Sequence, residues 1–283
     1  PAGTAAPLHL KAGRWDEVRP QTAGWRYLSF HVLRLSPGGR ALLGDDREEL
    51  AAVVLAGDAV VGAPGAEWQL PGRSSVFEGP PWGVYLPPGE RMTVEARGAL
   101  ELAVVGARST RRGQPRLITP DDVEVEVRGA GSATRQINHI LPPTFPAEHL
   151  LVVEVLTPAG NWSSYPPHKH DRHLPPEEVA LEEFYYFRIR PPHGFAFQRV
   201  YSPERNVDLS VAVGEGDVVL VPYGYHVSAA PHGFDLYYLN GLAGEVRSMA
   251  AVDDPAMAYI RRTWEGMDRD PRVPMGVPSG GGS

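Results

Sequence analysis

The 283-residue sequence contains no cysteine, so disulfides and thiolate metal ligands are both excluded. Any metal site must therefore be built from histidine and carboxylate side chains. No apolar run approaches the roughly 20 residues needed to span a bilayer. Basic residues are not in excess either. The net charge is −7 and the pI is near 5.8, whereas phosphate binding needs a basic face. We therefore expect neither a membrane nor nucleic acid as a partner.

The start of the chain also lacks the pattern of a signal peptide. No basic segment leading into an apolar one follows Pro1, so we expect no signal peptide. Together with the absence of cysteine, this favours a cytoplasmic protein.

Glycine and proline are abundant, with 31 and 29 copies scattered along the chain. They separate short β-prone runs, which is typical of many strands joined by turns. The sequence therefore predicts an all-β fold. One helix of about three turns is expected after the last strand, because Asp254 can cap it, Pro255 suits its first turn and Gly266 can end it. The runs predicted as strands are Leu50–Leu55, Val123–Val127, Leu151–Leu156, Phe184–Ile189, Val207–Val213, Val218–Val221 and Phe234–Leu239.

Two pairs of segments resemble each other across the halves of the chain. Glu48-Glu-Leu-Ala-Ala-Val resembles Glu182-Glu-Phe-Tyr-Tyr-Phe, and Val84-Tyr-Leu-Pro-Pro-Gly-Glu-Arg91 resembles Val219-Leu-Val-Pro-Tyr-Gly-Tyr-His226. Turns containing Pro and Gly can recur by chance in such a chain, but both features recur in the same order. This order favours a duplication whose boundary falls near residues 129–135.

The histidines are concentrated in the second half, which holds eight of the ten. In the segment Pro167-His168-Lys-His170, alternation on a strand places both imidazoles on one face, so they can reach a single ion. His226 follows the turn Val221-Pro-Tyr-Gly. The first half has no His-x-His and carries Arg91 where the second has His226, which predicts a first barrel without a metal site.

A carboxylate for the same ion comes from the pair Glu182-Glu183. Alternation puts Glu183 on the face of Tyr185 and Phe187, and Glu182 on the face of Arg188. The less charged face favours Glu183 as the ligand, with Glu182 as the alternative. Surface histidines would explain a lone His-x-His. The ordered set His168, His170, Glu183 and His226 instead predicts a divalent metal site.

These residues carry a resemblance to the cupin superfamily, whose metal-binding members use three histidines and one glutamate inside a small β-barrel. More narrowly, Gly160-Asn-Trp-Ser-Ser-Tyr-Pro-Pro-His-Lys-His-Asp171 and Gly216-Asp-Val-Val-Leu-Val-Pro-Tyr-Gly-Tyr-His226 resemble the 5-deoxy-glucuronate isomerase family of myo-inositol catabolism. The resemblance implies a bicupin of two fused cupin-type (jelly-roll) β-barrels with a short C-terminal helix. The expected divisions are 1–132 without a metal site, 133–270 with the metal site and terminal helix, and 271–283 as a flexible tail.

The family implies conversion of 5-deoxy-D-glucuronate, a small sugar acid, to 5-dehydro-2-deoxy-D-gluconate by an aldose–ketose isomerisation. Zinc is the metal we expect, with manganese, iron or nickel as alternatives. The unused Glu182 or a metal-bound hydroxide can serve as general base, Arg199 can bind the substrate carboxylate, and Tyr238 can supply a hydroxyl. Three alternatives stay open: the pectin-pathway uronate ketol-isomerase, a cupin dioxygenase, or a non-catalytic sugar-binding bicupin. A homo-oligomer is possible for any of them.

Overall fold

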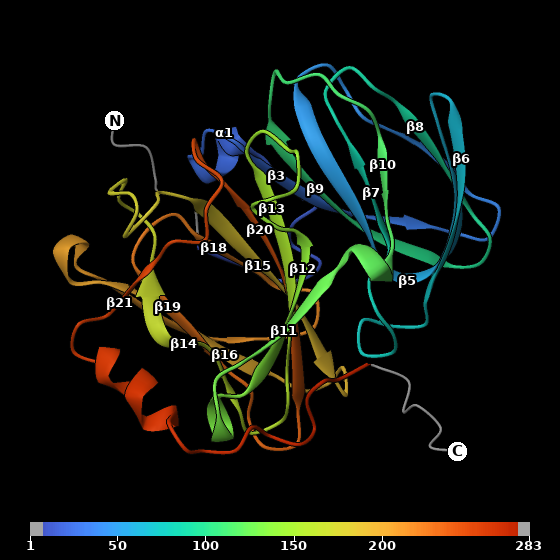
Figure 1. Ribbon diagram of the computed structural model, residues 1–283. Helices are drawn as coiled ribbons and strands as arrows, with labels where there is room; N and C mark the ends of the chain where they lie inside the picture. Colours follow the sequence, from blue (N-terminus) through green and yellow to red (C-terminus); the bar gives the residue numbers. More distant parts are fainter. Residues whose placement is uncertain (1–7, 277–283) are drawn as a thin grey trace.

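The computed structural model describes residues 8–276, and in that range the chain forms two curled β-structures packed side by side (Figure 1). One is coloured blue to green in the figure and the other green to orange. Strands dominate both, so the all-β prediction is confirmed. Within residues 8–276, no helix combines the length and the apolar character needed to cross a membrane.

The first barrel is built from β2 to β10 of a single sheet. Its longest strand, β5, belongs to both walls, because its first half pairs with β7 and β9 and its second half with β6 and β8. A short helix, α1 (Pro20–Ala23), separates β2 from β3. The strands are β2 (Glu17–Val18), β3 (Leu28–Leu35), β4 (Arg40–Leu43), β5 (Glu48–Ala63), β6 (Ala66–Arg73), β7 (Gly83–Leu86), β8 (Met92–Ala96), β9 (Leu100–Arg108) and β10 (Arg116–Ile118).

The second barrel consists of two sheets facing each other. In order, the first sheet contains β1 (His9–Leu10), β18 (Val218–Val221), β15 (Glu182–Arg190), β20 (Asp235–Ala243), β13 (Leu150–Thr157), β12 (Arg135–Leu141) and β11 (Glu124–Arg128). The other contains β17 (Val207–Val213), β16 (Ala196–Ser202), β19 (Tyr225–Ala229), β14 (Trp162–Lys169) and β21 (Val252–Asp253). The early strands β1 and β11 thus join the second barrel, and the division at residue 132 stays a prediction.

Three apolar cores follow from the alternation of side chains along the strands. One fills the first barrel and one fills the second. The third lies where the two barrels pack against each other. In β15, Tyr185 and Phe187 point into the second barrel, while Phe184 and Tyr186 point into the interface between the barrels. Both faces of β15 are therefore buried, and Glu183 lies on its inner face.

Strand register corrects the sequence alignment of the two halves by one residue. Leu50 lies opposite Leu86 in the first barrel, and Glu183 lies opposite Val221 in the second. Since Leu86 and Val221 both precede the matching Pro-x-Gly turns, Leu50 corresponds to Glu183, and Glu49 corresponds to Glu182. Alignment of identical residues instead matches Glu48 with Glu182, because the sequence alone does not show strand register.

A similar offset is found at the position of His226. His226 pairs with His168, and the first barrel pairs Met92 with Leu43 at the matching strand ends. Met92 is buried in the first core, whereas the guanidinium of Arg91 lies 3.7 Å from Asp46 near the surface. Counted from the turn Arg91 matches His226, but the residue that points into the barrel here, as His226 does in the second barrel, is Met92.

Buried carboxylates tie the two barrels together. Arg73 of the first barrel forms a two-pronged ion pair with Glu154 of the second, at 2.7 and 3.0 Å, and both side chains are almost fully buried. Glu182 accepts hydrogen bonds from the backbone N–H groups of residues 26–28 in the first barrel. In the reverse sense, Glu49 accepts them from residues 148–150 in the second.

The C-terminal segment differs from the expected α-helix. Only the 3₁₀ helix η4 (Ala258–Trp264) forms after turn residues. The segment's start is tied to the barrel, because the N–H of Asp254 donates to Pro167 O at 2.8 Å and its carboxylate accepts from the Tyr201 hydroxyl. Residues 277–283 of the expected tail lie outside the described residues. Just before them, the N–H of Met275 donates to Gln136 Oε1 at 2.6 Å. The remaining 3₁₀ segments are η1 (Pro120–Asp122), η2 (Gly131–Ala133) and η3 (Pro203–Arg205).

Candidate metal centre

Three strands of the second barrel bring the expected ligands together. His168 lies near the end of β14, with His170 just beyond it. His226 is the second residue of β19, which pairs with β14. Glu183 comes from β15 in the opposite sheet, at the end nearest these histidines. The site thus lies between the two sheets.

The tightest part of the cluster contains His170, Glu183 and His226, whose ligand atoms all lie within 4.8 Å of one another. Glu183 Oε2 is 2.9 Å from His170 Nε2 and 3.2 Å from His226 Nε2. His168 stands at the edge: its ring lies 4.6 Å from the His226 ring and 6.4 Å from the His170 ring, and it is only half-buried. All four expected residues therefore meet, three of them closely.

The histidine hydrogen bonds test whether a metal fits. Each Nδ1 is bonded to a backbone carbonyl: His168 to Pro166 O, His170 to Leu181 O and His226 to Gly224 O, at 3.1–3.2 Å. With the proton on Nδ1, each Nε2 presents a lone pair, the arrangement that metal-bound imidazoles adopt. An Nε2 lone pair and a carboxylate oxygen 2.9 Å apart repel unless a proton or a cation lies between them. Nε2 of His226 is also buried with no hydrogen-bond partner within residues 8–276. The donor set therefore fits a divalent cation.

The charge states suit the same role. Burial alone would raise the pKa of Glu183, but the adjacent His226 and His170 outweigh it and hold that pKa well below its ordinary value. Burial, and then the neighbouring His226 and His170, lower the pKa of His168 well below its ordinary value. At neutral pH, Glu183 is thus an anion and His168 a neutral imidazole.

A chain of hydroxyl groups lies directly beside this cluster. The Tyr185 hydroxyl is 2.9 Å from Ser164 Oγ, which is 3.1 Å from the Tyr238 hydroxyl, and that hydroxyl is 2.6 Å from Ser163 Oγ. The Tyr185 ring packs edge-on against His226, with 5.8 Å between ring centres. Burial, followed by the charge of Glu183, raises the pKa of Tyr185 well above its ordinary value, so the phenol stays protonated.

Sequence reasoning named Tyr238 but not Tyr185, Ser163 or Ser164 as functional candidates. One signal was available, because alternation placed Tyr185 on the same face as Glu183. For the serines no periodic signal existed: the register of β14 shifts between Ser163 and His168, and Ser164 has a φ of +49°.

Two expected catalytic residues lie elsewhere. The Glu182 carboxylate accepts three backbone N–H bonds from residues 26–28 on the outer face of β15, so it does not face the cluster. Arg199 points outward from β16, where it pairs with Asp208 at 2.7 Å. The expectations that Glu182 is the base and that Arg199 binds the substrate carboxylate therefore disagree with this geometry.

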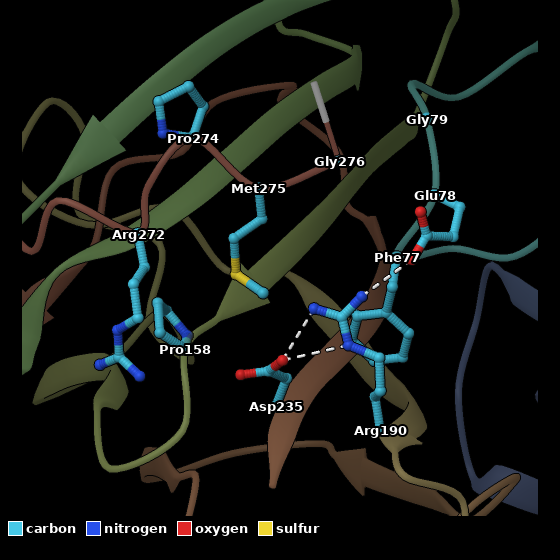
Figure 2. A pocket seen from close by; sticks show the side chains of 10 residues that line it. All are labelled: Phe77, Glu78, Gly79, Pro158, Arg190, Asp235, Arg272, Pro274, Met275 and Gly276. Carbon is cyan, nitrogen blue, oxygen red and sulfur yellow. Dashed lines mark hydrogen bonds and ion pairs between the residues drawn. The ribbon is translucent and has the colours of Figure 1, made fainter. Parts of the chain in front are cut away.

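A separate cavity of about 640 Å³ lies where the C-terminal segment passes between the barrels (Figure 2). Figure 2 shows Arg190 between Asp235 and Glu78, to which it is bonded at 2.8 and 3.0 Å. Its guanidinium also lies 4.8 Å from the centre of the Phe77 ring. None of the residues that line this cavity belongs to the histidine cluster.

Comparison with known proteins places the chain in a family. The model of the KduI/IolB family matches residues 8–260. A protein of Geobacillus thermodenitrificans named 5-deoxy-glucuronate isomerase is 48% identical over 250 residues, 88% of this chain and 91% of that protein. The crystal structure of an IolB-like protein from Salmonella typhimurium superposes with a TM-score of 0.87 at 41% identity, covering 90% of this chain and 99% of that one.

A more distant likeness bears on the fold alone. The oxalate decarboxylase of Lactobacillus farciminis is 14% identical, with a TM-score of 0.63 over 94% of this chain and 98% of that chain. This likeness in fold over nearly the whole of both chains, together with the two barrels described above, confirms the bicupin expectation. From the matched residues and the identity to its relatives, the chain belongs to the KduI/IolB family.

Proposed function

We propose that this protein is a metal-dependent isomerase that converts 5-deoxy-D-glucuronate to 5-dehydro-2-deoxy-D-gluconate. The relatives' shared name, 5-deoxy-glucuronate isomerase, supports the reaction, and the match covers most of both chains. The observation that carries the metal dependence is the buried cluster of His170, Glu183 and His226, in which two Nε2 atoms and one carboxylate converge.

The metal ligands we propose are His170, Glu183 and His226, with His168 as the fourth ligand on the open side of the site. When bound, a divalent ion acts as a Lewis acid that polarises the substrate carbonyl and stabilises the negative charge that develops on the adjacent oxygens. We propose zinc, with manganese, iron or nickel as alternatives, since imidazole and carboxylate suit all of them. The chain's own part is to fix the imidazoles through Nδ1 and to keep Glu183 ionised.

In the isomerisation, the hydrogen of the hydroxyl-bearing carbon is replaced by one on the former carbonyl carbon, and the proton of that hydroxyl by one on the former carbonyl oxygen. Among the hydrogen-bonded hydroxyl groups described above, that of Tyr185 belongs to the ring packed against His226. The raised pKa of Tyr185 keeps this hydroxyl protonated. We propose that it donates a hydrogen bond to a substrate oxygen, while Ser164, which is itself bonded to Tyr238, holds the Tyr185 hydroxyl in place. Glu182 is not available for this step.

We also propose the finer features that the sequence predicts. These are residues 1–132 and 133–270 as the two units, a cytoplasmic site of action and a homo-oligomeric state. The absence of cysteine supports the compartment. Light scattering of the purified chain measures its mass in solution and tests the oligomer.

The direct test is an NMR time course with 5-deoxy-D-glucuronate, run beside a chelator-treated sample. We expect formation of the 2-ketose, its loss on chelation and its return when metal is added. A dissolved-oxygen electrode in the same reaction should register no uptake, since an isomerase consumes no O₂. Absence of turnover by the metal-loaded protein would reject the substrate, and oxygen uptake would favour a cupin dioxygenase.

A further inference from the structure

The loop that joins His170 to Glu183 is held by a buried cluster of charges that the proposed reaction does not use. Lys169 Nζ donates to both carboxylate oxygens of Glu178, at 2.7 and 2.9 Å, and to Asp171 Oδ1 at 2.7 Å. Lys169 is 8% exposed and Glu178 3% exposed. We call these three residues the strap. Because Lys169 lies between two histidines on a strand, its side chain occupies the opposite face of β14.

One arm of the strap ends on His226. The second carboxylate oxygen of Asp171, Oδ2, accepts a hydrogen bond from the N–H of Gly224 at 2.8 Å. The carbonyl of Gly224 in turn accepts the Nδ1–H of His226, with 3.1 Å between the heavy atoms. Gly224 has a φ of +89°, and a Cβ there would lie 2.6 Å from Tyr201 O, so only glycine fits this turn. Asp171 therefore fixes the residue whose carbonyl orients the His226 ring.

The other arm ends on His170. Glu178 Oε1 also accepts the backbone N–H groups of Asp171 and Arg172, both at 2.9 Å, which folds the loop back on itself. At the end of the loop, the N–H of Leu181 donates to His170 O at 2.9 Å. The carbonyl of Leu181 accepts the Nδ1–H of His170 at 3.2 Å. The loop thus starts and finishes on this histidine.

Stability alone is a poor reason for such a cluster. Desolvating an ammonium and two carboxylates offsets much of their attraction, and apolar residues of similar size often stabilise a fold as well or better. The two carboxylates that Lys169 holds instead bond to backbone N–H groups beside the cluster: Glu178 accepts those of the two residues after His170, and Asp171 accepts that of Gly224, two residues before His226. Partners that orient metal-bound imidazoles typically change metal affinity by about 10–100-fold when they are removed.

We propose that Lys169, Asp171 and Glu178 are positioning residues that hold the His170 and His226 rings with Nε2 directed at the cluster. This inference deepens the proposed function and rests on it for the identity of the occupant.

The test compares Lys169→Met and Asp171→Ala with the unaltered protein, using Co²⁺ as a spectroscopic probe. We expect chelator competition to show Co²⁺ affinity lower by about 10–100-fold, with a changed visible d–d spectrum. Asp171→Asn should recover part of the affinity, because its amide oxygen can still accept the Gly224 N–H. Arg172→Met is the matched control. The Arg172 side chain is in the same loop but bonds Glu204 at the surface, so affinity and spectrum should stay unchanged.

A second measurement does not need the metal. In the metal-free protein labelled with ¹⁵N-histidine, long-range ¹H–¹⁵N spectra should show the Nδ1–H tautomer for His226, whose Nε2 has no hydrogen-bond partner among residues 8–276, and a mixture of tautomers for His226 in Asp171→Ala. Unchanged tautomers together with unchanged Co²⁺ affinity in both strap variants would overturn the proposal. Failure of the unaltered protein to bind any metal would reject the proposed function instead, and the tautomers would then decide the positioning role alone.

Discussion

The two barrels share an architecture but differ at the positions that hold the cluster. Each has a strand that runs into a Pro-x-Gly turn and a partner strand headed by a structural glutamate. The second barrel places the polar side chains of the cluster at three inner positions, and the first barrel places apolar side chains there. Leu50 corresponds to Glu183 beside the turn, and the paired inner residues Leu43 and Met92 lie where the second barrel has the pair His168 and His226.

The difference shows that this fold closes without a metal. Leu43, Leu50 and Met92 are all buried and belong to one apolar core. In the second barrel, Glu183 and His226 are as deeply buried, at 4% and 0% exposure, although burial of a polar group costs free energy unless it is bonded. The second barrel therefore keeps groups that its fold does not require, as expected of a functional site.

The largest difference in activity is expected between two single variants, one that removes the proposed ligand His226 and one that removes Met92 in the first barrel. His226→Ala should lower kcat/KM by about 10⁴-fold, since the Lewis acid contributes several kcal/mol to the transition state, and metal content should fall with it. Met92→Ala should leave kcat/KM within about threefold but lower the free energy of unfolding by about 3 kcal/mol. Steady-state kinetics, metal analysis and urea unfolding measure the three quantities. Full activity of His226→Ala would contradict the proposed site.

The next effect comes from giving the first barrel the carboxylate of the second. Leu50→Glu buries a charge with no cation nearby, so we expect a loss of about 4 kcal/mol in the free energy of unfolding. Leu50→Met is the control, with a loss of less than about 1.5 kcal/mol. Urea unfolding at neutral pH compares the two. Equal stability of both variants would mean that the first barrel admits water or a cation at this position.

Some of this comparison could be predicted from the sequence. Local alternation and the order of motifs were enough for the all-β fold, for its two barrels and for the inner face of Glu183. The one-residue offset between the halves was not accessible, because register depends on pairing between strands far apart in the chain. For the same reason Glu182 was assigned to catalysis, whereas its partners are backbone groups of residues 26–28, about 155 positions away.

Arg199 illustrates the same limit. Its neighbours in sequence gave no indication that Asp208, which lies opposite Tyr201 in β17, would bond it diagonally across the β16–β17 hairpin. The strap was also hidden, although alternation correctly turned Lys169 away from the cluster. Its partner Glu178 lies in a loop without periodicity, and the contact with Gly224 links segments 53 residues apart.

A smaller effect on kcat should distinguish two tyrosines. Tyr185 lies beside the cluster in the second barrel, and Tyr85 lies beside Glu49 in the first. Tyr185→Phe removes the hydroxyl next to the cluster and should lower kcat by about 100-fold while metal content stays unchanged. Tyr85→Phe removes the hydroxyl that donates to Glu49 at 2.7 Å, and should affect stability but not kcat. Kinetics of the two metal-loaded variants decide this. An equal kcat for both would exclude a catalytic role for Tyr185.

The smallest effect on activity is expected from Glu49 and Glu182, each of which accepts backbone N–H groups from the other barrel. Glu182→Gln and Glu49→Gln each turn an amide donor toward backbone N–H groups, so each should destabilise the protein without removing metal. Glu49 accepts three N–H groups and the Tyr85 hydroxyl in full burial, whereas Glu182 accepts three N–H groups and is only half-buried. We therefore expect losses of about 3 kcal/mol for Glu49→Gln and about 1 kcal/mol for Glu182→Gln. Urea unfolding gives both values, and kcat measured on the folded protein provides the contrast with Glu183. If Glu182→Gln instead abolished turnover while the protein stayed folded and metal-bound, Glu182 would regain the catalytic role that its contacts argue against.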